Sequence, residues 1–244
     1  MTGQRYRDIV VIGGGCYGSF YATQLATARD RGKLTFESVI LVDQDPACQA
    51  VREGRVGSGI RLEVASWNDF VDRFFERSAP APGEPDDAIV PSPLMPHLMA
   101  HWLERRGDGR VAPAPADLPF GTPFDKLAPD GTRYVSFADW LCPTHCIEPG
   151  LCPAISAPRT WEMSDAVTEY VGRINAERPA VGPAIFITRH RTYGVGMFDM
   201  GEVRRARAIL AAALRERVPT DVVVATVSSC HGAVTILRTS PIPA

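Results

Sequence analysis

The chain has 244 residues, 26 Lys and Arg against 28 Asp and Glu, and 45% apolar side chains, which is an ordinary globular composition. The net charge of −2, without long basic runs, argues against nucleic acid or an anionic membrane as a partner. The longest apolar runs are strand-sized, so no membrane span is expected, and no secretion signal is recognisable at the start. We therefore expect a cytoplasmic protein whose six cysteines are thiols or metal ligands rather than disulfides.

The chain opens on a predicted strand, turn, helix and strand. Residues 8–12 predict a compact, largely apolar strand, residues 16–29 have a helical pattern, and residues 38–42 predict a second strand. Further strands are predicted from β-branched content and flanking turns at residues 60–64, 88–91, 184–188, 222–227 and 234–237. Helical patterns lie between most of them, at residues 67–75, 95–105, 164–175 and 202–217.

This alternation predicts a single α/β domain over residues 1–244. The expected fold is a doubly wound, mostly parallel, Rossmann-like sheet with helices on both faces. Only residues 228–232 separate the last two strands, so these strands are expected to form a terminal antiparallel hairpin at one edge. Residues 107–161 interrupt the alternation, are rich in Pro and Gly, and hold three of the cysteines. They are predicted to be an inserted metal-binding segment.

A glycine pattern follows the first predicted strand directly. Gly13, Gly15 and Gly18 form the pattern G-x-G-x-x-G. In this pattern the first glycine permits a tight turn, the second lets the backbone approach a pyrophosphate, and the third lets the helix pack closely on the strand. Asp43 ends the second strand, where an acid holds the ribose hydroxyls of NAD. With Cys16 at the start of the helix, these residues are the predicted nucleotide contacts. The structural alternative is a glycine turn kept only for packing.

The same region carries a family resemblance. Residues 9–18, 39–46 and 60–70 resemble the nucleotide-binding domain of bacterial potassium-uptake regulators of the Trk/RCK type. The resemblance covers residues 8–105 and implies a Rossmann fold that binds NAD(H) or another adenine nucleotide. Residues 42–46 also resemble the ribose-binding strand end of Rossmann-like methyltransferases, for which S-adenosylmethionine would be the ligand.

Three cysteines gather inside the Pro-rich segment. Cys142, Cys146 and Cys152 lie close together, and a proline follows the first and the third. Proline stiffens a short loop, so that several sulfurs can point inward. The spacing C-x3-C-x5-C predicts a metal site, an iron–sulfur cluster or zinc, with His145 and Cys230 as the further ligand candidates. A redox dithiol and buried free thiols are the alternatives.

Two weaker patterns lie outside that loop. His97 and His101 share a face of a predicted helix at metal-ligand spacing, but such a pair alone is more typical of an ordinary amphipathic helix. Residues 189–196 follow a strand and are polar and glycine-bearing. We interpret them either as an anion-binding loop or as a solvated one.

Together these features favour a redox or accessory protein that binds NAD(H) or a related nucleotide, with a cysteine-ligated metal site nearby, as a subunit of a larger redox complex. A hydride carries two electrons and a cluster takes one, so direct exchange needs a flavin or a protein partner. An enzymatic role would be that of an NAD(P)-linked oxidoreductase component. The alternatives are a nucleotide-gated regulatory subunit with structural zinc and an S-adenosylmethionine-dependent methyltransferase.

Overall fold

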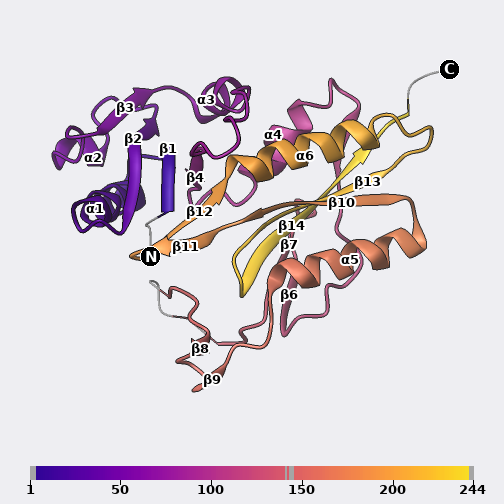
Figure 1. Ribbon diagram of the computed structural model, residues 1–244. Helices are drawn as coiled ribbons and strands as arrows, with labels where there is room; N and C mark the ends of the chain where they lie inside the picture. The colour runs from indigo at the N-terminus through magenta and orange to yellow at the C-terminus, as the bar shows by residue number, and fades with distance from the viewer. Residues whose placement is uncertain (1–3, 141, 143–145, 242–244) are drawn as a thin grey trace. The chain divides into compact units, whose positions relative to one another are not determined.

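The structure is a computed structural model that describes residues 4–140, 142 and 146–241. The chain divides into two compact units (Figure 1), Met1–Met95 with Arg189–Gly201, and Pro96–Thr188 with Glu202–Ala244, where the sequence pattern favoured one domain. Each unit has a six-stranded sheet of its own, and each of these sheets contains both parallel and antiparallel strand pairs. The expected doubly wound, mostly parallel sheet through the whole chain is therefore wrong.

The first unit is built on a six-stranded sheet of order β11-β12-β4-β1-β2-β3. In chain order its elements are β1 (Gln4–Ile12), α1 (Cys16–Asp30), β2 (Leu34–Asp43), α2 (Gln49–Arg52), β3 (Ile60–Val64), α3 (Trp67–Phe74), β4 (Ala88–Val90), β11 (Arg189–Thr192) and β12 (Val195–Asp199). The four strands β4, β1, β2 and β3 are parallel, and the antiparallel hairpin of β11 and β12 extends the sheet beyond β4. Residues 189–196, interpreted above as a loop, are thus largely strand.

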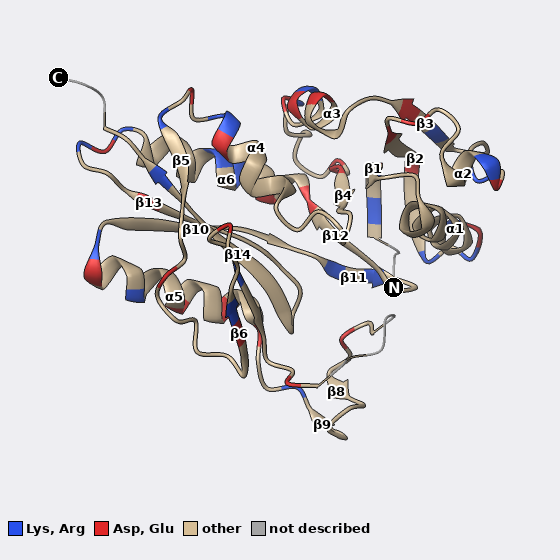
Figure 2. Ribbon diagram, turned by 180° about the vertical axis from the view of Figure 1, so that it is seen from behind, with Lys and Arg blue, Asp and Glu red and all other residues tan. Residues whose placement is uncertain are grey.

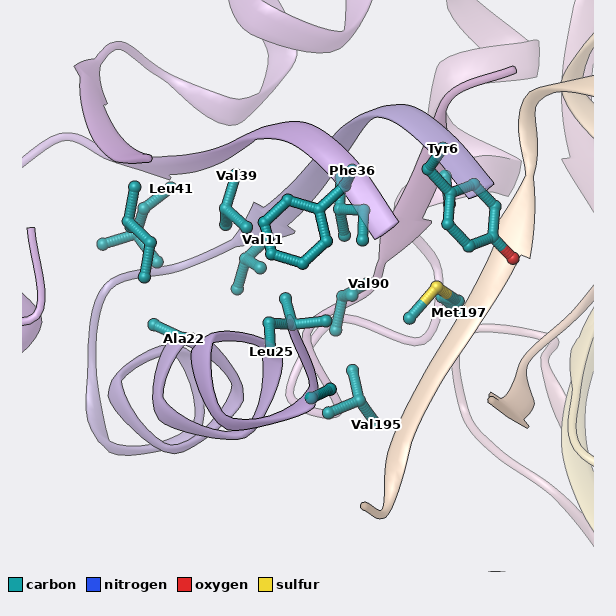
Figure 3. Packing of buried hydrophobic residues seen from close by; sticks show 14 of the residues in the cluster. Tyr6, Val11, Ala22, Leu25, Phe36, Val39, Leu41, Val90, Val195 and Met197 are labelled. Atoms are coloured by element: carbon teal, nitrogen blue, oxygen red, sulfur yellow. The ribbon is translucent and has the colours of Figure 1, made fainter. Parts of the chain in front are cut away.

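The core of the first unit lies between α1 and the sheet (Figure 3). Leu25 of α1 packs with Val11 of β1 and with Val39 and Leu41 of β2, and Met197 of β12 joins the same cluster. Apolar side chains recur on one face of the helix, and the strands are runs of β-branched and aliphatic residues that are buried along their inner parts. The predicted helix and the first two predicted strands are confirmed here.

The second unit contains a six-stranded sheet of order β10-β13-β14-β7-β6, in which β5 also pairs with β14. The elements of this part of the chain are α4 (Leu98–Arg105), β5 (Val111–Ala114), β6 (Phe124–Leu127), β7 (Arg133–Ser136), β8 (Leu151–Cys152), β9 (Ala157–Pro158), α5 (Met163–Glu177), β10 (Ala180–Ile187), α6 (Met200–Ala213), β13 (Asp221–Val227) and β14 (His231–Thr239). The predicted hairpin of β13 and β14 is confirmed, but it lies in the middle of the sheet rather than at an edge.

The Pro-rich segment is only partly an insertion. Three of its strands, β5, β6 and β7, belong to the second sheet, and β7 pairs with the central strand β14. Its later part, which contains the cysteines, forms only the short β8 and β9 pair. The segment therefore builds part of the core before it becomes a peripheral loop.

Helices cover both faces of the second sheet (Figure 1). The inner face of α5 packs Val167, Tyr170 and Ile174 on residues of β13 and β14 that include Val223 and Val234, while acidic and basic residues are interspersed on the outer face of α5 (Figure 2). None of the helices in the described part of the chain combines the length and the apolar character needed to cross a bilayer.

Replacing Tyr170 with phenylalanine is expected to lower the free energy of unfolding by about 1 kcal/mol, because one buried hydrogen bond is lost. The Tyr170 hydroxyl donates to the Leu118 carbonyl oxygen at 2.7 Å, and the side chain is fully buried. Urea denaturation of the variant measures this change. The matched control, Tyr17→Phe at an exposed tyrosine of α1, should leave the midpoint where it is; an unchanged midpoint for Tyr170→Phe would contradict the expectation.

Candidate functional site

Most glycines of the turn between β1 and α1 are required by the fold. Gly13 has a φ of +89° and donates its N–H to the Val42 carbonyl at 2.9 Å. A Cβ on Gly18 would lie 1.8 Å from the Gly13 carbonyl oxygen, and one on Gly14 would lie 2.4 Å from Cys48 Sγ. Each of these positions excludes a side chain for reasons internal to the turn, so they carry no information about a ligand.

Gly15 is different, because nothing in the fold requires a glycine there. It is the exposed N-cap residue of α1, its φ of −75° suits any side chain, and a Cβ would meet nothing within 4 Å. Among the described residues no side chain caps α1, and its first turn holds no acid. The first N–H groups and the positive end of the helix dipole are therefore open to an anion.

The strand order brings this turn to a favourable place. In the parallel part of the first sheet, of order β3-β2-β1-β4, the direction of strand succession reverses between β1 and β4. Ligands of open parallel sheets bind beyond the carboxyl ends of the strands at such a reversal. The glycine turn directly follows the carboxyl end of β1, so its backbone lies at that position.

Asp43, predicted to hold a ribose, also ties two loops together. Its Oδ2 accepts the Gly14 N–H at 2.6 Å, and its Oδ1 accepts the Asp45 N–H at 2.9 Å. Each carboxylate oxygen has two lone pairs, so acceptor capacity remains for a hydroxyl. Cys16 is exposed and, with Glu53 and others, lines a pocket of about 260 Å³ beside the start of α1.

The structure links Cys146 of the loop to Cys230 of the hairpin through hydrogen bonds to Glu148. Cys152 lies in β8, and Cys230 is buried in the turn between β13 and β14. Burial, and next the charge of Cys146, raise the pKa of Cys142, to which Cys152 also contributes. Burial raises the pKa of Cys230 to about 11, and the charge of Cys146 adds to that rise. The charge of Cys146 therefore acts on both the loop thiol Cys142 and the hairpin thiol Cys230.

N–H groups are directed at these sulfurs. The backbone N–H of Glu148 donates to Cys146 Sγ at 3.4 Å, and the indole Nε1 of Trp161 donates to Cys230 Sγ, also at 3.4 Å. The indole Nε1 of Trp140 is buried without a hydrogen-bond partner in the described part of the chain. This indole lowers the pKa of Cys142 and so partly offsets the effect of burial on that thiol. Such donors stabilise thiolates and tune metal centres.

Glu148 is a residue of this site that the sequence analysis did not assign. Its carboxylate is 6% exposed and lies 3.7 Å from Nδ1 of His231. It accepts hydrogen bonds from the Ser228 hydroxyl, from the Ser229 N–H at 2.8 Å and from the Cys230 N–H at 3.3 Å. The sequence signal was the single acid within residues 141–153, a stretch rich in cysteine and proline.

The predicted ligands, the four cysteines included, do not form a closed metal site among the described residues. His145 lies outside the described residues. Within residues 4–140, 142 and 146–241, no three His, Cys, Asp or Glu side chains are arranged to hold a metal ion. His97 is engaged elsewhere, since its Nε2 hydrogen-bonds the Tyr134 hydroxyl at 2.7 Å, with the His101 ring 6.0 Å from its own. That arrangement agrees with the interpretation of His97 and His101 as residues of an ordinary amphipathic helix rather than as metal ligands.

Comparison with known proteins places the second unit in a family. A family model with the description "Uncharacterized protein, C-terminal domain" (AF_1314_C) matches residues 95–240, a range that holds nearly all of the second unit. No match is found among curated proteins or among solved structures. Because the matched segment is more than half of the chain, the protein belongs to this family.

Proposed function

We propose that this chain is a redox or accessory protein that holds a metal by cysteine thiolates in its second unit and binds an NAD(H)-type nucleotide with its first. The observation that carries the proposal is the link between the cysteine loop and the tip of the β13 and β14 hairpin: the Glu148 N–H donates to Cys146 Sγ, the Glu148 carboxylate accepts the Cys230 N–H, and the Trp161 indole N–H donates to Cys230 Sγ. Cys142, Cys146 and Cys152 are close together in the sequence, whereas Cys230 comes from a hairpin about 80 residues further on.

The donor set fits a thiolate-bound metal. Four sulfurs suit a structural zinc ion or an iron–sulfur cluster, and the buried indole N–H of Trp140 lowers the pKa of Cys142. Cys142, Cys146, Cys152 and Cys230 would hold the group, with His145 as the alternative fourth ligand. An iron–sulfur cluster would supply single-electron transfer, whereas zinc would fix the loop.

The raised thiol pKa values add a testable property. The pKa values of Cys142 and Cys230 are raised above that of an ordinary thiol, mainly by burial, so both hold their protons more firmly than an ordinary thiol does. A metal binds thiolates, so it must displace these protons. We expect proton release on metal binding and weaker binding as the pH falls, and isothermal calorimetry in buffers of different ionisation enthalpy measures this release.

The nucleotide half of the proposal is supported by Gly15. Its open position, the uncapped start of α1 and the reversal of strand order between β1 and β4 coincide at one turn. Asp43 retains acceptor capacity for ribose hydroxyls beside that turn. An acid at this place favours NAD(H) over its 2′-phosphorylated form, because the added phosphate would be repelled.

Calorimetric titration of the purified protein with NADH, NADPH, ATP and S-adenosylmethionine tests the nucleotide half. We expect NADH to bind and NADPH to bind more weakly. Binding of S-adenosylmethionine alone would favour a methyltransferase, and binding of none of the four would remove the nucleotide from the proposal.

The kind of metal separates the redox role from the regulatory one. Visible absorption that bleaches on reduction would favour electron transfer through a cluster. Colourless protein with bound zinc would favour a nucleotide-gated regulatory subunit, in which the loop is a structural clasp.

A further inference from the structure

We propose that Glu148 is a positioning residue that holds Cys146 and Cys230 side by side, so that one metal centre can take both. This inference rests on the proposed metal function of the second unit. It concerns a residue whose carboxylate accepts three hydrogen bonds from the hairpin turn and which is assigned to positioning rather than to metal ligation.

A single residue makes both connections. The backbone N–H of Glu148 donates to Cys146 Sγ at 3.4 Å, and the Glu148 carboxylate accepts the backbone N–H of Cys230 at 3.3 Å. Cys146 and Cys230 are far apart in the sequence. Within the part of the chain that the structure describes, no other residue forms hydrogen bonds with both of them. Glu148 therefore connects the Cys146 sulfur with the backbone of Cys230.

The conformation of Glu148 indicates that its contacts matter. Its φ of +52° lies in the left-handed region, which a residue with a side chain adopts at a cost of about 1 kcal/mol or more. The carboxylate is buried, and a buried charge is tolerated only when it is well hydrogen-bonded. Hydrogen bonds from the Ser228 hydroxyl and from the Ser229 and Cys230 N–H groups meet this need.

Other bonds hold the hairpin tip in place independently of Glu148. The Phe137 N–H donates to the Cys230 carbonyl at 2.9 Å, and the Met163 N–H donates to the Ser229 carbonyl at 2.9 Å. Loss of the Glu148 carboxylate should therefore free the cysteine loop from the hairpin while β13 and β14 remain paired.

The test is cobalt(II) binding to the full-length, metal-depleted protein, followed by the sulfur-to-cobalt charge-transfer absorption. Glu148→Gln is expected to weaken cobalt binding by roughly 10- to 100-fold, as the loss of a residue that orients metal ligands typically does. The absorption per bound cobalt should also fall, since Cys230 no longer joins the centre. Ser228→Ala, which removes one donor to the carboxylate, should give a smaller change in the same direction.

The matched control is Glu169→Gln, at an exposed glutamate of α5 in the same unit, which should bind cobalt as the parent protein does. Unchanged affinity and absorption in both Glu148→Gln and Ser228→Ala would overturn the role of Glu148. Weaker binding with full sulfur absorption per cobalt would also overturn it, because that result identifies Glu148 as an oxygen ligand. Failure of the parent protein itself to bind cobalt would instead reject the proposed metal function.

Discussion

Replacing Gly15 with aspartate is expected to lower NADH affinity by at least about 100-fold, close to 3 kcal/mol, while the protein stays as stable as before. The new carboxylate would occupy the open space at the start of α1. There it would compete with the pyrophosphate for the same N–H groups and repel its charge. Asp is among the best N-cap residues, so stability should be equal or slightly higher. Calorimetric titration with NADH and thermal denaturation measure the two effects.

Two further variants separate the possible causes. Gly15→Asn has nearly the same size and also caps helices well, so its smaller loss of affinity would measure the steric part of the effect. Gly18→Ala should instead destabilise the first unit, because its Cβ would meet the Gly13 carbonyl oxygen. Gly15→Asp with unchanged NADH affinity would show that the open position is not a nucleotide site.

Replacing Cys146 with serine is expected to reduce metal affinity by at least about 1,000-fold, or about 4 kcal/mol, because thiolate ligation supplies most of the binding free energy of such centres. The same loss is expected for Cys230→Ser, although this residue lies in a separate hairpin. Competition with a chromophoric chelator measures both affinities.

Cys48→Ala is the control for this pair of variants, because Cys48 is a buried cysteine of the first unit that packs against the glycine turn. It should keep full metal affinity. Parent-like affinity in Cys230→Ser would mean that the centre closes without the hairpin cysteine, and His145 would then be the candidate fourth ligand.

Local patterns in the sequence predicted the elements of the first unit well. The apolar run of β1, the glycines after it and the helical repeat of α1 are each set by neighbouring residues. The same holds for α5, where Val167, Tyr170 and Ile174 mark the buried face. In these segments the local preference and the final packing agree.

The partners of the strands could not be predicted in this way. Strands β10 and β13 are parallel to each other, as an alternating α/β pattern suggests, but they pair in the second sheet and not with β1. Strands β5, β6 and β7 are each four residues long, and β5 contains Pro113. Over so short a length no period can be distinguished, and a proline argues against a strand.

The candidate sites were also only partly predictable from the sequence. The cysteines and the glycine pattern are visible in the sequence because the residue types themselves are informative. The role of Glu148 depends on a contact with a hairpin some 80 residues away, and no local pattern encodes such a contact. The distinction between Gly15 and Gly18 likewise requires the positions of surrounding atoms.

The measurement that tests the central claim most directly is the metal content of protein purified without oxygen, combined with alkylation of its cysteines before and after chelation. We predict one zinc ion or one iron–sulfur cluster per chain, with Cys142, Cys146, Cys152 and Cys230 protected until the metal is removed and Cys16 labelled throughout. Protein that contains neither iron nor zinc, and whose exposed Cys142 is labelled at the same rate with and without a chelator, would contradict the account.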